Sequence, residues 1–211
     1  METENRSDNA SRRIELFVAA LLGIAAVLTA VSALRSALLG DEVVKGFTES
    51  SQHYGDAIAF EHAQTQQVLH DQNLFLRYVE ARNADDADFA EELRSRHFTE
   101  NLTAAVDWWE SKPDTDEVLR TPFDEDSPYV DLHAGDIRSQ NQAGDQAFER
   151  AERADNRGDL FDIAAAVLSV TLFTAGIASL LRSSSARRLT LAIAIAAMCV
   201  GIMFMIRGHF G

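Results

Sequence analysis

The sequence predicts an all-α protein with three transmembrane spans and an extramembrane domain built as a helical hairpin or bundle. Three apolar runs of 18 or 19 residues contain no charged residue and no histidine; they are residues 16–34, 163–181 and 189–206. A helix rises about 1.5 Å per residue, so each run can cross a hydrocarbon layer of roughly 30 Å. All three prolines lie between positions 113 and 128, which leaves long stretches without a helix breaker. No segment alternates β-branched and polar residues, so no strand is predicted.

The apolar runs divide the chain into segments in a simple order. We expect an N-terminal tail, a first span, an acidic helical domain containing a proline-bearing loop, a second span, a short basic turn and a third span. The expected bounds are 1–13, 14–39, 40–159 with the loop at 112–134, 160–182, 183–188 and 189–207. The first apolar run has 19 residues, whereas the apolar core of a signal peptide has about 7–15, so we expect an uncleaved anchor.

The short basic flanks predict the orientation of these spans. Arg6, Arg12 and Arg13 precede the first span, and arginines at 182, 187 and 188 surround the turn between the second and third spans. Basic residues in short loops favour the cytoplasmic side. With three spans both flanks fall on the same side, so we expect a multi-pass cell-membrane protein with a cytoplasmic N-terminus and an extracytoplasmic acidic domain.

The net charge of −14 comes from the middle of the chain. Residues 40–159 contain 28 acidic residues against 11 lysines and arginines. A field of this sign repels phosphates, so the acidic domain is not expected to bind nucleic acid or anionic lipid headgroups. The lipid bilayer is the first expected partner, and either a homo-oligomer or another membrane protein is the second.

Three helical stretches are predicted in the middle of the chain. The first covers about residues 42–82, the second covers 85–111 after a turn and N-cap at residues 83–85, and the third begins near 136 and continues into the second span. An approximate helical stripe is expected on the first stretch: Phe47, Tyr54, Ile58, Val68, Leu69, Phe75, Leu76 and Val79. The second should present one apolar face: Phe89, Leu93, Phe98, Leu102, Ala105, Val106 and Trp109.

Small residues at spacings of three and four form the candidate helix-packing sites. On the third stretch and its approach to the membrane they are Gly144, Ala147, Ala151, Ala154 and Gly158, and in the spans they are Ala19, Gly23, Ala197 and Gly201. Small side chains let two helix backbones approach closely, which matters most in lipid. The neighbour could belong to the same chain or to another subunit, and an alanine-rich helix chosen for its propensity would show the same pattern.

No pattern in the sequence indicates catalysis or a cofactor. There is no phosphate-binding glycine loop, no nucleophile elbow and no zinc-protease motif. Asp131, His133 and Asp136 could offer ligands to a divalent cation, but a solvated acidic loop is far more common. Cys199 is the single cysteine, so no disulfide forms within one chain. We therefore expect no enzyme activity, no cofactor and no metal site.

These observations favour a non-enzymatic integral membrane protein that self-associates or scaffolds partners through its acidic helical domain. The alternative is a homo-oligomeric channel or transport component. Its pore would be lined by the few polar side chains of the spans, which are Thr29, Ser32, Ser169, Thr171 and Thr174. Hydroxyl groups of this kind also donate hydrogen bonds to their own helix, which would give them a purely structural role.

The layout resembles a family of small prokaryotic membrane proteins that contain a domain of unknown function. Three features carry the resemblance: a first span that runs into Ser36-Ala37-Leu38-Leu39, a charged helix over residues 148–162 that leads into the second span, and a short arginine-containing turn before the third. The resemblance implies one N-terminal span, a helical middle region and a C-terminal two-span hairpin. No activity is established for the family, so no functional residue is implied.

Overall fold

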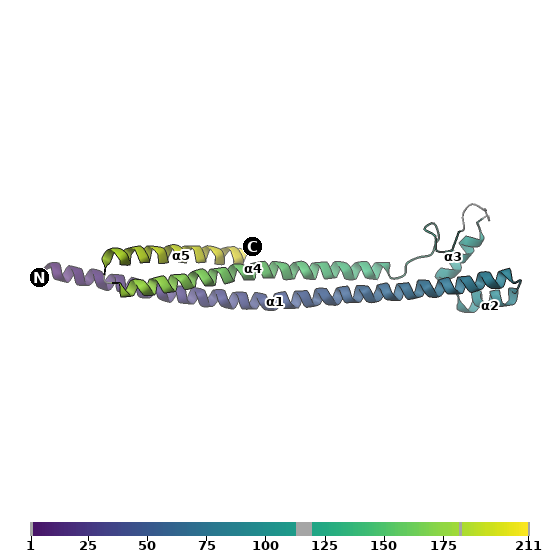
Figure 1. Cartoon of the computed structure of the whole chain (residues 1–211), viewed down its shortest axis with the longest axis horizontal. Helices are drawn as coiled ribbons and strands as arrows, with labels where there is room; N and C mark the ends of the chain where they lie inside the picture. Colours follow the sequence, from purple (N-terminus) through teal and green to yellow (C-terminus); the bar gives the residue numbers. More distant parts are fainter. Residues whose placement is uncertain (1, 113–119, 182, 211) are drawn as a thin grey trace. The chain divides into compact units, whose positions relative to one another are not determined.

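The computed structural model describes residues 2–112, 120–181 and 183–210, and the side chains within them except those of residues 2–13 and Ser184. The described part contains five helices and no strand, which confirms the predicted all-α class. The helices are α1 Glu2–Asn83, α2 Ala87–His97, α3 Glu100–Glu110, α4 Ala134–Leu180 and α5 Ser184–Phe210 (Figure 1). Pro113 and Arg182, and the side chains of Arg6, Arg12 and Arg13, lie outside the described residues.

Helices α1, α4 and α5 are each long and apolar enough to cross a membrane. The third predicted stretch continues into the second apolar run without a break, as expected, because no proline lies between residues 134 and 180. Two boundaries differ from the expected ones. The expected N-terminal tail forms the first turns of α1. Arg187 and Arg188, expected in a turn, lie in the first turns of α5, where the Arg187 amide donates to the Ser183 carbonyl.

The chain forms two compact units. The first, called the span unit, comprises Met1–Ser50 and Asp145–Gly211, and the second, called the acidic unit, comprises Ser51–Gly144. Residues 51–144 contain 20 acidic residues and 7 lysines and arginines, and all the predicted spans lie in the other unit.

The span unit is an antiparallel arrangement of three helices (Figure 1). Between α1 and α4, the residue numbers of the contacting pairs decrease along α1 as they increase along α4, as in an antiparallel pair. The pairs are Gly46 with Ala151, Leu39 with Gly158, and Leu21 with Ala175. The contacts between α4 and α5 also have opposite residue order, so these two helices are antiparallel too. The pairs are Phe161 with Gly208, Leu168 with Gly201, and Ala175 with Ala194. This register brings the apolar runs 16–34, 163–181 and 189–206 to the same level of the three-helix unit.

Within the acidic unit, α1 ends in a tight turn that leads directly into α2. Asp85 adopts a left-handed backbone conformation with φ of 59°, and the Asp86 amide donates to the Ala81 carbonyl over 3.0 Å. This is the Schellman arrangement, which normally takes glycine but tolerates aspartate. The turn occurs where it was predicted, but the N-cap is Asp86, whose carboxylate accepts from the Phe89 amide.

The expected single helix over residues 85–111 is wrong, because the chain breaks at Phe98 and Thr99. Phe98 is extended, and the Thr99 hydroxyl accepts a hydrogen bond from the Leu102 amide, which makes Thr99 the N-cap of α3. A threonine that satisfies a free amide at a helix start favours a new helix over continuation of the old one. The sequence Thr99-Glu100 therefore carried a start signal inside an apparently continuous pattern.

The core of the acidic unit is aromatic and aliphatic. Its buried residues come from α1, α2 and α3: Leu74, Phe75, Tyr78, Ala81, Ala90, Leu93, Leu102 and Val106. Phe98 and Trp109 pack against this core, as expected, but Phe89 is exposed because Ala90 takes the inward position. The expected stripe on α1 is only partly inward: Phe75 is buried, whereas Ile58, Leu69 and Leu76 are exposed.

Candidate functional site

The small-residue face of α4 packs within the span unit against α1. Ala147, Ala151 and Ala154 are buried, and a Cβ placed on Gly46 of α1 would lie 2.8 Å from the Cβ of Ala151. Gly158 is buried too, with the Leu39 side chain 3.7 Å from where its Cβ would be. Glycine and alanine at these positions therefore permit a backbone approach that a larger side chain would prevent.

At Gly144 in the acidic unit and at Gly201 in the span unit, a neighbouring side chain also lies too close for a Cβ atom. Within the acidic unit, a Cβ on Gly144 would lie 2.9 Å from the ring of Tyr54. In the span unit, a Cβ on Gly201 of α5 would lie 2.8 Å from the side chain of Leu168, and Ala197 one turn earlier is half-buried. Gly201 thus lies at the contact between α5 and α4.

Ala19 and Gly23, the small pair of the first span, are placed differently. Both are exposed, and a Cβ on Gly23 would meet no atom within 4 Å. The first span instead buries Val18, Leu21 and Ala25. These three also recur at spacings of three and four, so sequence spacing alone does not distinguish the two faces.

The hydroxyl groups of the spans donate to carbonyl groups of their own helices. Thr29 donates to Ala25 over 2.8 Å, and Ser169, Thr171 and Thr174 each donate to the carbonyl four residues earlier. Such bonds satisfy the hydroxyl in an apolar environment. Ser32 is buried, and its hydroxyl has no hydrogen-bond partner among the described residues.

One face of α1 in the acidic unit is apolar and exposed. Ile58, Leu69 and Leu76 are 52%, 53% and 58% exposed. They are 11 and 7 residues apart, about three and two turns, so they lie on one side of the helix. The buried residues Ala57, Leu74, Phe75 and Tyr78 lie on the other side.

This exposed face of α1 is also nearly free of charge. Residues 51–79 contain only Asp56, Glu61, Asp71 and Arg77 as charged residues. Asp71 is fully buried, and the positions at seven-residue spacing that complete the apolar stripe are Ser51, Thr65 and Gln72. We call this surface, defined by Ile58, Leu69 and Leu76, the α1 face.

A buried carboxylate joins the loop before α4 to α1. The Tyr129 hydroxyl donates to one Asp71 oxygen over 2.7 Å, and the Gln67 side-chain amide donates to the other over 2.9 Å. Burial, then the hydrogen bond to Asp71, raises the pKa of Tyr129 above its ordinary value. The Asn101 side chain holds the next loop residue, because it donates to the Val130 carbonyl and accepts from the Val130 amide, each over 2.9 Å.

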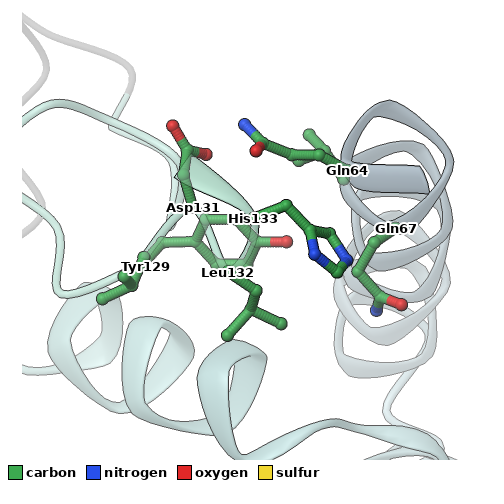
Figure 2. A pocket seen from close by; sticks show the side chains of 8 residues that line it. Gln64, Gln67, Tyr129, Asp131, Leu132 and His133 are labelled. Atoms are coloured by element: carbon green, nitrogen blue, oxygen red, sulfur yellow. The ribbon is translucent and has the colours of Figure 1, made fainter. Parts of the chain in front are cut away.

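A small pocket lies beside this carboxylate, between α1 and the loop (Figure 2). The ring of His133 is directed toward the part of α1 that carries Gln64 and Gln67. The pocket volume is about 10 Å³, room for about one water molecule. The buried His133 Nδ1 lies 3.5 Å from an Asp136 oxygen without making a hydrogen bond to it.

The expected alternative of a cation site at Asp131, His133 and Asp136 gains no support from this geometry. Only the contact between His133 and Asp136 is formed, and no group of three or more histidines, cysteines or carboxylates within the described ranges could hold a metal ion. Cys199 is exposed on α5.

An ionic network at the other end of the acidic unit ties three helices together. Glu110 of α3 accepts hydrogen bonds from Tyr78 and Arg82 of α1 and from Arg94 of α2, over 2.6, 2.5 and 3.1 Å. Arg94 also pairs with Asp107. Burial acts to raise the pKa of Glu110, but these hydrogen bonds and the two guanidinium charges outweigh it and lower the pKa.

A family described as a domain of unknown function, DUF4337, matches residues 101–211. The match covers α3, the following loop, α4 and α5, and therefore includes two of the three apolar helices. No curated protein and no solved structure shows significant similarity to the chain. The match agrees with the resemblance, predicted from the layout, to a family that contains a domain of unknown function.

Proposed function

The chain belongs to the DUF4337 family, and we propose that it is a non-enzymatic, multi-pass integral membrane protein that self-associates through the α1 face of its acidic unit. The observation that carries this proposal is an exposed apolar face, nearly free of charge, on an otherwise strongly acidic unit. The acidic unit is proposed to be extracytoplasmic and the N-terminus cytoplasmic, as the basic flanks predict.

The register of the span unit supports the placement in a membrane. Three apolar runs, recognised independently in the sequence, fall at the same level when α1, α4 and α5 pack. Their outward side chains are large and apolar, including Ile24, Val27, Phe173, Ile193 and Met203. A bilayer is the solvent that matches an uncharged belt of this kind around three helices.

Charge favours a second copy of the chain as the occupant of the α1 face. Two copies of a unit with 20 acidic and 7 basic residues repel each other over most of their surfaces. The α1 face lowers that obstacle, because the side chains that define it are apolar and carboxylates lie only at its edges, at Glu61 and Glu80. The seven-residue spacing of Ser51, Ile58, Thr65 and Gln72, with Leu69 and Leu76 beside it, suits pairing of two helices in a left-handed coiled coil.

Membrane anchoring further favours association of identical chains. The α1 face begins at Ile58, 24 residues after the end of the first apolar run, on the same helix. Two chains anchored in one bilayer have the same orientation, and their confinement raises the effective concentration of one face for the other. The small-residue face of α4 is not available for this contact, because the chain's own side chains cover it.

Two other roles were expected as alternatives and gain no specific support. A channel would use the hydroxyl groups of the spans, but four of the five donate to their own helices. A scaffold for a different membrane protein would use the same α1 face, and the experiment below distinguishes that case.

Cysteine crosslinking in native membranes tests the proposal. Ile58→Cys, Leu69→Cys and Leu76→Cys are each made in a Cys199→Ser background, oxidised in the membrane and separated without reductant. We expect a band at twice the chain mass for all three. Ala63→Cys and His70→Cys are matched controls, because both positions are exposed on another side of the same helix. They should remain monomeric.

Two results would overturn self-association. One is crosslinking of the control positions as efficiently as the α1 face, which indicates random collision. The other is the absence of a doubled band at all three test positions. A crosslinked band of another mass would assign the face to a different protein instead of a second copy.

A further inference from the structure

A pocket in the span unit lies between α1 and α5, and one residue of α4 also lines it. It has a volume of about 340 Å³, within the range of about 300–1,000 Å³ found for small-molecule sites. Its walls are Leu28, Val31 and Arg35 of α1, Phe161 of α4, and Ile202, Met205, Ile206, His209 and Phe210 of α5. The pocket therefore belongs entirely to one of the two compact units.

The lining changes from apolar to polar in the same direction on both walls. Along α1 the order is Leu28, Val31, Arg35, and along α5 it is Ile202, Met205, Ile206, His209, Phe210, so the one polar side chain of each wall lies toward its C-terminal end. The two helices run in the same direction, because each is antiparallel to α4. Arg35 is the first residue after its apolar run, and His209 lies three residues after the end of the other. The polar end of the pocket is therefore at the edge of the apolar belt.

The cationic end of the pocket is available to a ligand. Arg35 is exposed and makes no hydrogen bond or ion pair with any described residue. His209 is also exposed, and its ring packs against the ring of Phe210. An arginine and a histidine beside each other can donate several hydrogen bonds to one phosphate, whereas the deeper walls offer no polar group.

We propose that this pocket binds a phospholipid, with one acyl chain between α1 and α5 and the phosphate against Arg35 and His209. A phospholipid has an apolar acyl chain for the apolar end of the pocket and a phosphate for the polar end. The negative phosphate complements the positive guanidinium of Arg35. Asp41 and Glu42 follow Arg35 within two turns on α1, so a zwitterionic headgroup suits the site better than one with a net negative charge. The proposal rests on the membrane placement in the proposed function, but not on self-association.

The test measures lipid binding to the full chain in detergent by native mass spectrometry. The probe is phosphatidylethanolamine, and the matched control is diacylglycerol with the same acyl chains, which lacks the phosphate. We expect phosphatidylethanolamine to bind. Diacylglycerol should bind at least about tenfold more weakly, because without the phosphate it cannot form the charge-assisted hydrogen bonds. Equal binding of the two lipids would overturn recognition of the phosphate.

Variants locate the site. Arg35→Ala should weaken the binding of phosphatidylethanolamine about tenfold, and Arg35→Lys should retain part of that binding. Val31→Trp should block the apolar part of the pocket. Arg207→Ala is the matched control, because Arg207 is an exposed cation at the same end of α5 that does not line the pocket. An equal loss in Arg207→Ala and Arg35→Ala would show general attraction to headgroups and would overturn the proposal.

Extraction of native membranes at alkaline pH separates a failure of this proposal from a failure of the membrane placement. A chain that stays in the membrane pellet but binds neither lipid contradicts the pocket alone. A chain released into the supernatant contradicts the membrane placement, and with it the pocket.

Discussion

The span unit and the acidic unit are both made of helices, but different side chains hold them together. In the span unit the closest approaches occur at glycine and alanine, such as Gly46 against Ala151 and Gly201 against Leu168. In the acidic unit the contacts are aromatic: Phe75 packs edge-on to Trp109 at 5.1 Å and to Phe123 at 6.0 Å. The difference follows the solvent proposed for each unit.

Apolar burial stabilises a helix pair in water but not in lipid, where the tails are as apolar as leucine. Close packing of small residues is then the main attraction, and large apolar side chains point outward. The core of the acidic unit is built in the other way, from large side chains such as Phe75, Tyr78 and Leu102 and a buried carboxylate satisfied by two donors. Both tryptophans, Trp108 and Trp109, are in the acidic unit, so their fluorescence reports on that unit alone.

The largest expected effect is a cavity in the aromatic core. Leu102 is fully buried, so Leu102→Ala should destabilise the acidic unit by about 2–5 kcal/mol. Thermal unfolding followed by tryptophan fluorescence measures this. Leu132→Ala, at an exposed position, is the control and should change little. Equal melting temperatures for the two variants would contradict the assignment of the core.

A smaller effect is expected from one added methyl group in the span unit. Gly46→Ala places a Cβ 2.8 Å from that of Ala151 and should destabilise the α1–α4 pair by about 1–3 kcal/mol. Gly40→Ala meets no atom within 4 Å and should be neutral or slightly stabilising, because alanine favours the helix. Loss of helical circular dichroism on heating in detergent reports the difference. If Gly46→Ala behaves like Gly40→Ala, the close approach is not formed.

The buried carboxylate of the acidic unit provides a third test. Tyr129→Phe removes one donor from Asp71 and should destabilise the unit by about 1–3 kcal/mol, since the carboxylate stays buried. The measurement is the tryptophan-detected unfolding midpoint in urea. In an Asp71→Asn background the effect should be smaller, because an uncharged partner needs the donor less. An equal effect in both backgrounds would argue against the charge-assisted bond.

The smallest expected effect is a loss of stability at alkaline pH. Burial, and then hydrogen bonds to carboxylates, raise the pKa values of Tyr129 and Tyr78 in the folded chain. A group with a raised folded pKa contributes stability below its unfolded pKa, here about 10, and that contribution is lost as the pH rises further. The acidic unit should therefore unfold more readily above about pH 10, with a weaker dependence in Tyr129→Phe. A midpoint that does not change between pH 8 and pH 11 would contradict this.

The long helices of this fold followed directly from the sequence. Uninterrupted apolar runs and the confinement of proline to positions 113–128 predicted the all-α class and the continuous α4. The break at Thr99 was missed, because a capping hydroxyl competes with helix continuation and leaves the apolar spacing unchanged. The inward choice of Ala90 over Phe89 was also missed, since it depends on what α1 and α3 present to that helix.

The candidate site was only partly predictable for a similar reason. Small residues at helical spacing identified Ala147 and Ala151 as contact positions, but spacing could not say which chain supplies the partner. Leu69 and Leu76 were expected on an apolar stripe, yet their exposure became visible only once Phe75 and Tyr78 were seen to face the core. The pocket at Arg35 joins α1 and α5, two segments that only the register of the three helices brings to the same level.

The most direct test of the central claim uses the chain's own cysteine. Cys199 is exposed on α5 within the third apolar run, so only a surrounding bilayer would shield it. Intact membranes are treated with a membrane-impermeant maleimide, and labelling is compared before and after detergent denaturation. We predict no labelling of Cys199 in intact membranes and complete labelling after denaturation. Labelling of Cys199 in intact membranes would place the span unit in water and contradict the account.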